Sequence, residues 1–290
     1  MRSERSVRTR GVILSVLGIL ALSPDSLLIR SISVDVYTLV FWRGALLGVG
    51  LTVGIAVAYR GGMVRAFLDT GRIGWASACV LAVGTILFVV AILHTSVANV
   101  LIITGVTPLL SAVLSLVFLK ERVFVRTWVA IIAALAAILV TVWENLEQGV
   151  WLGDVLALGA AVFVSTHVVI VRHAKGVNLV PSVAMGGVVV AVLMSPFASP
   201  TSASSIDAVL LCVLGLVVLP VAFGLLTLAP RYLPAPEVSL IKLSEMVLGP
   251  LWVWLAIGER PGEMAFLGGG MLVMTLVVHT VVGGRTVRSG

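Results

Sequence analysis

The chain has 290 residues, of which 60% are apolar and 11% are charged, and its mean hydropathy is +1.18. Soluble domains have about 45–50% apolar and about 25% charged residues, so a water-soluble enzyme and a disordered chain are both excluded. The net charge of +6 is divided among short segments between apolar runs, and no basic stripe predicts a nucleic-acid partner.

Ten runs are long and apolar enough to cross a bilayer as helices, each of which needs about 20 apolar residues. In chain order, as spans 1 to 10, they cover residues 11–30, 36–59, 73–93, 97–119, 124–143, 152–172, 181–198, 206–229, 234–257 and 263–283. Span 1 has the basic start of a signal peptide, but it is too long for one, and Pro24-Asp25 interrupts any small-residue cleavage site. We therefore expect a retained first span and an all-α polytopic membrane fold with ten transmembrane helices. A membrane β-barrel is not expected, because its strands alternate in polarity over about 10 residues.

The distribution of Lys and Arg predicts the orientation of the chain. With the N-terminus inside, inner segments hold fifteen of these residues, and outer segments hold only Arg30 and Arg260. Outer loops instead carry acidic residues such as Asp35 and Asp207. The positive-inside rule therefore places both termini in the cytoplasm.

The sequence contains no enzyme signature. It has no His, Cys, Asp and Glu set with metal-ligand spacing, no phosphate-binding Gly-rich loop and no nucleophile elbow. We expect no cofactor, no metal and no ATP, so any transport must be secondary. Cys79 and Cys212 lie inside apolar runs and are expected to be small buried core residues.

The second half of the chain repeats the first at a nearly constant shift. At a shift of 138, residues 98–123 lie over 236–261; at a shift of 142, Arg30 meets Arg172 in the first span of each half. Five spans per half is an odd number, so the halves, residues 1–146 and 147–290, must have opposite orientations. Inverted repeats around a midplane site are typical of secondary transporters; the alternative is gene duplication in a structural membrane protein.

Three local features accompany this architecture: the run Leu119-Lys120-Glu121-Arg122 ending span 4, Arg43-Gly44 in span 2, and Glu245 fourteen residues before Glu259. Over its whole length the chain resembles the EamA family of the drug/metabolite transporter superfamily, in its ten-span bacterial form. The resemblance implies a bacterial inner-membrane carrier whose central cavity is lined by spans 1, 3, 4, 6, 8 and 9. It also implies substrates among amino acids, other small metabolites and drugs, but it does not select one. Many relatives have Glu-Pro in span 9, where this chain has Glu245-Met246.

Ionisable residues inside the spans are the first candidates for substrate binding or coupling, because each costs about 2.5–3.5 kcal/mol to insert. Asp25 and Arg43 lie at similar predicted depths in neighbouring spans, which predicts an ion pair between them. That pair either binds substrate or only orients span 1. Lys242 and Glu245 are three residues apart on span 9 and are expected to share a helix face near the midplane. An intrahelical salt bridge is the alternative for this second pair.

The repeat adds three more candidates. His167 in span 6 is the repeat mate of Asp25, and Thr104 and Thr107 are the mates of Lys242 and Glu245. Polar residues of both halves are therefore expected to converge on one site. Three prolines, at which we expect the helices to break or loosen, accompany them: Pro24, Pro108 and Pro250.

These patterns predict a secondary transporter that exports small polar or zwitterionic metabolites, with amino acids as the foremost class. Asp25 and Glu245 would meet an ammonium group, Arg43 or Lys242 a carboxylate, and His167 or Glu245 a coupling proton. The alternatives are a carrier of larger organic anions or cofactors such as nucleotides or flavins, a non-transporting membrane sensor or scaffold, and a membrane-embedded enzyme. Glycine pairs in the spans permit close packing within one bundle, and both a monomer and a homodimer remain open.

Overall fold

The computed structural model describes residues 2–94, 100, 103–121, 123–142 and 151–258, with scattered positions between 267 and 278. Six of its helices are long and apolar enough to cross a membrane, namely Ser6–Ile29, Val36–Tyr59, Gly71–Ala91, Val155–His173, Ser205–Arg231 and Ala235–Ala256. Shorter apolar helices cover Thr107–Leu119, Val125–Ala137 and Val180–Met194. The described chain is therefore an all-helical polytopic membrane protein, while most of predicted span 10 lies outside the described residues.

The first half of the chain forms the helices α1 Arg2–Leu22, α2 Asp25–Ser31, α3 Val36–Tyr59, α4 Met63–Leu68, α5 Gly71–His94, α7 Thr107–Leu114, the π-helix η1 Ser115–Leu119 and α8 Val125–Val142. The second half forms α9 Trp151–His173, α10 Val180–Met194, α11 Ser205–Cys212, the π-helix η4 Val213–Val218, α12 Leu219–Leu228, α13 Ala235–Lys242 and α14 Glu245–Ile257, with short 3-10 turns at Pro200–Ser202 and Ala229–Arg231. Spans 1, 4, 8 and 9 are thus each built from more than one helical piece.

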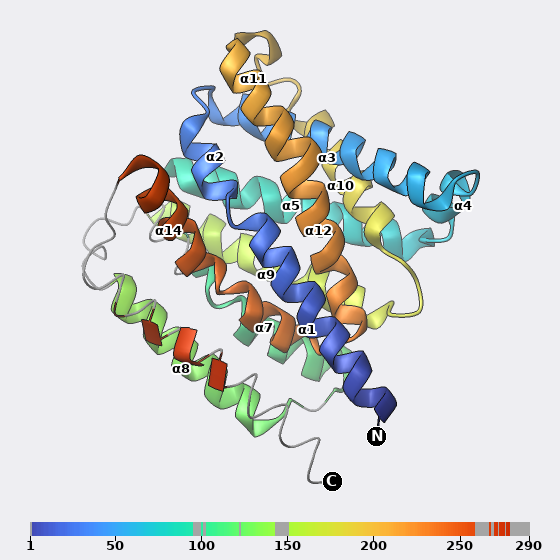
Figure 1. Cartoon of the computed structure of the whole chain (residues 1–290), viewed down its shortest axis with the longest axis vertical. Helices are drawn as coiled ribbons and strands as arrows, with labels where there is room; N and C mark the ends of the chain where they lie inside the picture. The colour runs from blue at the N-terminus through green and yellow to red at the C-terminus, as the bar shows by residue number, and fades with distance from the viewer. Residues whose placement is uncertain are drawn as a thin grey trace.

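The helices form a bundle in which α1 runs beside α12, and α8 lies at the edge (Figure 1). Neighbouring helices are α5 with α9, α3 with α10, and α7 with α9 and α13. The backbones of α3 and α10 approach closely at two glycines. A Cβ on Gly44 would lie 2.7 Å from the Gly187 carbonyl oxygen, and a Cβ on Gly187 would lie 2.7 Å from the Gly44 carbonyl oxygen. Gly44 therefore permits packing inside the bundle.

Polar contacts join the segments that the charge rule assigns to one side. At the predicted inner end, Arg8 binds the Glu237 carboxylate at 3.0 Å, and the Arg172 side chain reaches both oxygens of Glu121 at 3.0 and 3.2 Å. At the other end of the bundle, the Ser33 amide donates to Asp207 at 2.8 Å. These contacts support two distinct ends to the bundle.

The loop before α3 is held by a helix cap. Asp35 caps this helix by accepting a hydrogen bond from the Thr38 amide at 3.0 Å. Hydrogen bonds from Thr38 lower the pKa of Asp35 below its ordinary value, so the cap carries a negative charge at neutral pH.

The expected burial of the cysteines is corrected by the structure. Cys79 and Cys212 are both exposed side chains on membrane-spanning helices. A thiol is apolar enough to face lipid as readily as a protein core, so the apolar runs alone do not determine which side chains are interior.

Candidate functional site

Three described spans are interrupted in mid-course. Span 1 breaks at residues 23–24 between α1 and α2, span 4 at 105–106 before α7, and span 9 at 243–244 between α13 and α14. At the breaks in spans 4 and 9 the α-helical bonds give way to tighter turn bonds, such as those from the Val106 amide to the Ile103 carbonyl oxygen at 3.2 Å and from the Ser244 amide to the Ile241 carbonyl oxygen at 3.1 Å. The helix termini created at a break have partial charges. Because broken helices occur at membrane depth only where protein or a cavity surrounds them, these breaks indicate a polar site.

Two of the three expected prolines lie at these breaks. Pro24 directly precedes α2, and Pro108 lies in the first turn of α7. Pro250 does not mark a break, because α14 continues without interruption from Glu245 to Ile257. The interruption of span 9 lies instead at 243–244, which is the repeat mate of 105–106 at the shift of 138.

Packing brings the three interruptions together. Helix α13 packs against α7 and α1, α14 against α2, and α9 against α7. The hydroxyls of Ser111 and Ser239 are 2.9 Å apart between α7 and α13. The Trp252 indole on α14 donates to the Ser23 hydroxyl at 2.8 Å, which fastens span 9 to the break in span 1.

The Asp25–Arg43 ion pair expected from the sequence is present. Both terminal nitrogens of Arg43 donate to the Asp25 carboxylate, one on each oxygen, and the second of these bonds is 3.2 Å. The two side chains are only 12% and 15% exposed. Asp25 is also the first residue of α2, where the helix dipole stabilises a carboxylate. A bidentate, charge-assisted pair of this kind is among the stronger polar contacts.

Lys242 and Glu245 lie on opposite sides of a helix break. Lys242 ends α13, and Glu245 begins α14, so they do not share one continuous helical face as the sequence predicted. Each charge has the sign that its helix terminus stabilises. In the described part of the chain no ion pair joins these two side chains, but the charges of Lys242, Asp25 and Arg43 all act on the Glu245 carboxylate.

His167 on α9 is buried at 6% exposure and is held by hydroxyl groups. Its Nδ1 atom lies 3.0 Å from the Ser77 hydroxyl on α5, which in turn accepts from the Ser182 hydroxyl of α10 at 3.1 Å. The charge of Lys242 also acts on this imidazole. His167 therefore lies near the charge of Lys242 and is joined by hydrogen bonds to α5 and α10. Ser77 and Ser182 were missed in the sequence, since only the fold brings these small hydroxyls to His167.

Thr104 and Thr107 flank the break at 105–106. The Thr107 hydroxyl donates to the Thr104 carbonyl oxygen, and the Thr104 hydroxyl donates to the Val100 carbonyl oxygen at 2.8 Å. Ser165 of α9 additionally donates to the Thr107 carbonyl oxygen at 3.3 Å. Side-chain hydroxyls thus satisfy backbone acceptors that the interrupted helix releases.

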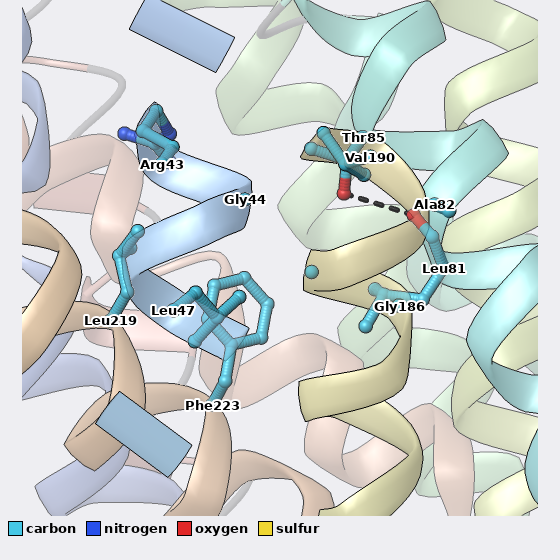
Figure 2. A pocket seen from close by; sticks show the side chains of 11 residues that line it. Arg43, Gly44, Leu47, Leu81, Ala82, Thr85, Gly186, Val190, Leu219 and Phe223 are labelled. Atoms are coloured by element: carbon cyan, nitrogen blue, oxygen red, sulfur yellow. Dashed lines mark hydrogen bonds between the residues drawn. The ribbon is translucent and has the colours of Figure 1, made fainter. Parts of the chain in front are cut away.

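A pocket lies beside this cluster, between α3, α5, α10 and α12. Arg43 borders it at one end; Leu47 and Phe223 form one wall, and Leu81 and Val190 lie across from them (Figure 2). The cavity volume is about 30 Å³, which is room for a water or two. Arg43 therefore belongs both to the ion pair with Asp25 and to the border of a mainly apolar pocket.

The described chain is an all-helical membrane protein with polar residues at interrupted spans, and its family match shows that it is a transporter, not an enzyme. Residues 9–143 and 151–281 each match the EamA-like transporter family, and the chain belongs to that family. A solved structure described only as "Crystal structure of protein" aligns with a TM-score of 0.82 and 17% identity, covering 97% of this chain and 100% of that chain. That likeness shows the fold alone. No functionally curated protein is significantly similar to the chain.

Proposed function

We propose that the protein is a secondary transporter that exports small zwitterionic metabolites, foremost amino acids, through a site at the three broken spans. The observation that carries this proposal is the charge composition of the site. Two cations, Arg43 and Lys242, and the carboxylate of Asp25 lie within electrostatic range of the Glu245 carboxylate, and Arg43 is paired with Asp25. Their charges balance, so a substrate with one ammonium and one carboxylate leaves the site neutral when it binds.

In this proposal each end of the substrate has a counterpart. The ammonium group binds between Asp25 and Glu245, and the carboxylate binds Arg43 or Lys242. Burying a charge without a partner is expensive, so a site with both signs favours a zwitterion over a simple anion or cation. A carrier of larger organic anions, such as nucleotides or flavins, is less well supported, because the only cations in this cluster are Arg43 and Lys242 in the described residues.

Alternating access is the proposed mechanism, and the helix contacts support it. When each span of one half is replaced by its mate in the other half, the contact between α1 and α12 becomes the contact between α9 and α5. In the same way, the contact between α7 and α9 becomes the contact between α14 and α2. All four contacts are present in the structure. The α3–α10 contact converts into itself. This pattern is expected of two inverted repeats, 1–146 and 147–290, that exchange conformations around a central site.

The ends of the bundle are the proposed gates. Arg8–Glu237 and Glu121–Arg172 each join one half of the chain to the other at the predicted cytoplasmic end, and Arg172 also donates to the Pro230 carbonyl oxygen at 3.2 Å. Opening that end requires these contacts to separate. The positive-inside rule supports an inner-membrane protein with both termini in the cytoplasm.

Coupling to protons is proposed through Glu245 or His167. Both are titratable, both lie at the site, and the charge of Lys242 acts on each. Binding or moving a substrate charge would change the field on either group and so link its protonation to transport. The working unit is proposed as a monomer or a homodimer.

The test is flux in proteoliposomes with a panel of labelled amino acids, with and without a pH gradient. The proposal predicts saturable uptake that Glu245→Gln abolishes, while the variant stays folded and inserted. A response to the gradient would support proton coupling. No flux across the panel, with folded protein oriented both ways, would overturn the amino-acid assignment and favour an organic-anion carrier or a membrane scaffold.

A further inference from the structure

His167 presents one ring nitrogen to a pair of hydroxyls and leaves the other without a partner. Its Nδ1 atom lies 3.0 Å from the Ser77 hydroxyl, and the side chain is only 6% exposed. Within the described residues, the Nε2 atom has no hydrogen-bond partner. Because a buried polar atom without a partner costs free energy, this nitrogen is a candidate contact for a ligand.

The hydroxyls decide which of the two nitrogens carries the hydrogen. The Ser182 hydroxyl has two acceptors, the Ser77 oxygen at 3.1 Å and the Leu179 carbonyl oxygen at 2.6 Å. The Ser77 hydroxyl has one described acceptor for its own hydrogen, and this acceptor is Nδ1 of His167. A buried hydroxyl that left its hydrogen unbonded would be destabilising. Nδ1 is therefore the acceptor, and the neutral imidazole carries its hydrogen on Nε2.

The Nε2–H group points away from α5, because the two nitrogens of an imidazole face nearly opposite directions. Helix α9 lies between α5 and α7 and also packs against α13 (Figure 1). Helix α7 begins after the break at 105–106, and α13 ends before the break at 243–244. The last residue of α13 is Lys242, whose charge acts on the imidazole. Among the described residues, the Lys242 ammonium forms no ion pair. A neutral donor and an unpaired cation are thus close together at the site.

We propose that neutral His167 donates its Nε2 hydrogen to the carboxylate of the substrate, and that Lys242 supplies the countercharge. This inference rests on the proposed function and assigns the carboxylate end of the zwitterion. Arg43 is the weaker candidate for that end, because both of its terminal nitrogens are already bound to Asp25. The ammonium end of the substrate then binds Glu245. A carboxylate that receives a hydrogen bond and a countercharge together is well compensated for its loss of water.

The groups around His167 agree with a neutral imidazole that keeps one protonation state during transport. Protonation of Nδ1 would break the bond from Ser77 and place a second cation beside Lys242. The other titratable side chains on described elements packed against α9 are bound elsewhere or exposed: Glu237 binds Arg8, Arg231 donates to the Lys175 carbonyl oxygen, and Arg72, Cys79 and His94 are exposed. Helices α7 and α12 contain no titratable side chain. Ser77 and Ser182 are therefore positioning residues that hold the hydrogen on Nε2, and the coupling proton is left to Glu245.

The first test compares an amino acid with its amide, which keeps the ammonium group and lacks the carboxylate charge. Inhibition of labelled amino-acid uptake into proteoliposomes gives the ratio of the two affinities within each protein, so that losses of folded protein cancel. The unaltered protein is expected to prefer the amino acid. His167→Phe removes the donor and should lower this preference by roughly tenfold or more, the usual effect of one hydrogen bond to a charged group. His167→Gln places an amide N–H near the position of Nε2 and should keep most of the preference. The matched control His173→Phe, at an exposed position of the same helix, should leave the preference unchanged.

The second test locates the hydrogen itself. Nitrogen NMR spectra of protein with isotope-labelled histidine, in which His167 is assigned by its loss in His167→Gln, should show Nδ1 unprotonated and Nε2 protonated at neutral pH. Ser77→Ala removes the bond to Nδ1, so it should mix the two tautomers and lower the preference for the amino acid. The matched control Ser15→Ala removes a buried hydroxyl that donates to the Gly11 carbonyl oxygen and should change neither.

The response of uptake to a pH gradient separates substrate binding from proton coupling. His167→Gln should respond as the unaltered protein does, because the coupling proton is on another residue. Loss of the response in His167→Gln, a hydrogen on Nδ1, or an unchanged amino-acid preference in His167→Phe would overturn the inference while leaving amino-acid transport intact. Absence of flux for every amino acid in the unaltered protein would overturn the proposed function as well.

Discussion

The breaks at 105–106 and 243–244 occupy equivalent positions in the two halves of the chain, but they have different chemistry. The first is flanked by Thr104 and Thr107, whose hydroxyls donate to backbone carbonyls. The second is flanked by Lys242 and Glu245, whose charges act on other members of the site. The same helix interruption is thus flanked by hydroxyls that bond to their own backbone in the first half, and by charged side chains in the second half. The comparison indicates that the helix interruption is common to both halves, while the charged residues beside it are present in the second half alone.

The largest expected effect comes from the ion pair beside the charged break. Asp25→Asn leaves the Arg43 guanidinium buried without its countercharge, and breaking such a pair costs about 3–5 kcal/mol of the free energy of unfolding. The thermal midpoint in detergent should fall sharply. The double variant Asp25→Asn/Arg43→Gln should recover most of that stability without recovering transport. Full transport by the double variant would show that this pair serves only the structure.

A smaller effect is expected at the inner end, where the two halves meet through charged contacts. Arg172→Gln removes the hydrogen bonds to Glu121, worth about 1.5–3 kcal/mol in total, and should favour opening at that end. Thiol labelling of Thr107→Cys, with both native cysteines replaced, should become faster from the cytoplasmic side. Glu121→Gln is the matched variant, and adding it to Arg172→Gln should change little further. Additive effects of the two substitutions would contradict a shared gate.

The smallest expected effect concerns the contact that fastens span 9 to span 1. Trp252→Phe removes the hydrogen bond to the Ser23 hydroxyl but keeps an aromatic ring, at a cost of about 0.5–1.5 kcal/mol. Ser23 retains its own bond to the Leu20 carbonyl oxygen. The thermal midpoint should therefore fall slightly, and the substrate preference should not change. A changed preference would make Trp252 part of the binding site.

The sequence predicted the structure best where a residue type has a single strong physical effect, as proline has on a helix and as a charge has inside a membrane. Proline predicted the breaks at Pro24 and Pro108, and the depth of two lone charges predicted the Asp25–Arg43 pair, which is present. The sequence did not predict the break at 243–244, because Leu243 and Ser244 are ordinary helix residues. The prediction placed the irregularity at Pro250 instead, where α14 is continuous. The repeat contained the missing signal, since 243–244 aligns with 105–106, where Gly105 marks a weak point in the helix.

Other features required the fold. The hydroxyls of Ser77 and Ser182 reach His167 from helices distant in sequence, and no local pattern distinguishes them from other small residues. The π-helix Val213–Val218 precedes Pro220, so the proline in the middle of span 8 was a usable but overlooked sign of irregular helix. The apolar pocket beside Arg43 depends on the close approach of α3 and α10, which Gly44 permits but does not specify.

The most direct measurement compares the two equivalent breaks in one flux assay. Glu245→Gln and its repeat mate Thr107→Val are reconstituted at equal amounts of folded protein, and uptake of a transported amino acid is measured for both. Loss of one partner from a desolvated charge contact costs about 2–5 kcal/mol of binding, so Glu245→Gln should lower uptake by at least roughly 30-fold. Thr107→Val loses one neutral hydrogen bond, worth about 1 kcal/mol of stability, and should retain most uptake. Equal losses in both variants, or normal uptake by Glu245→Gln, would contradict the assignment of function to the charged break.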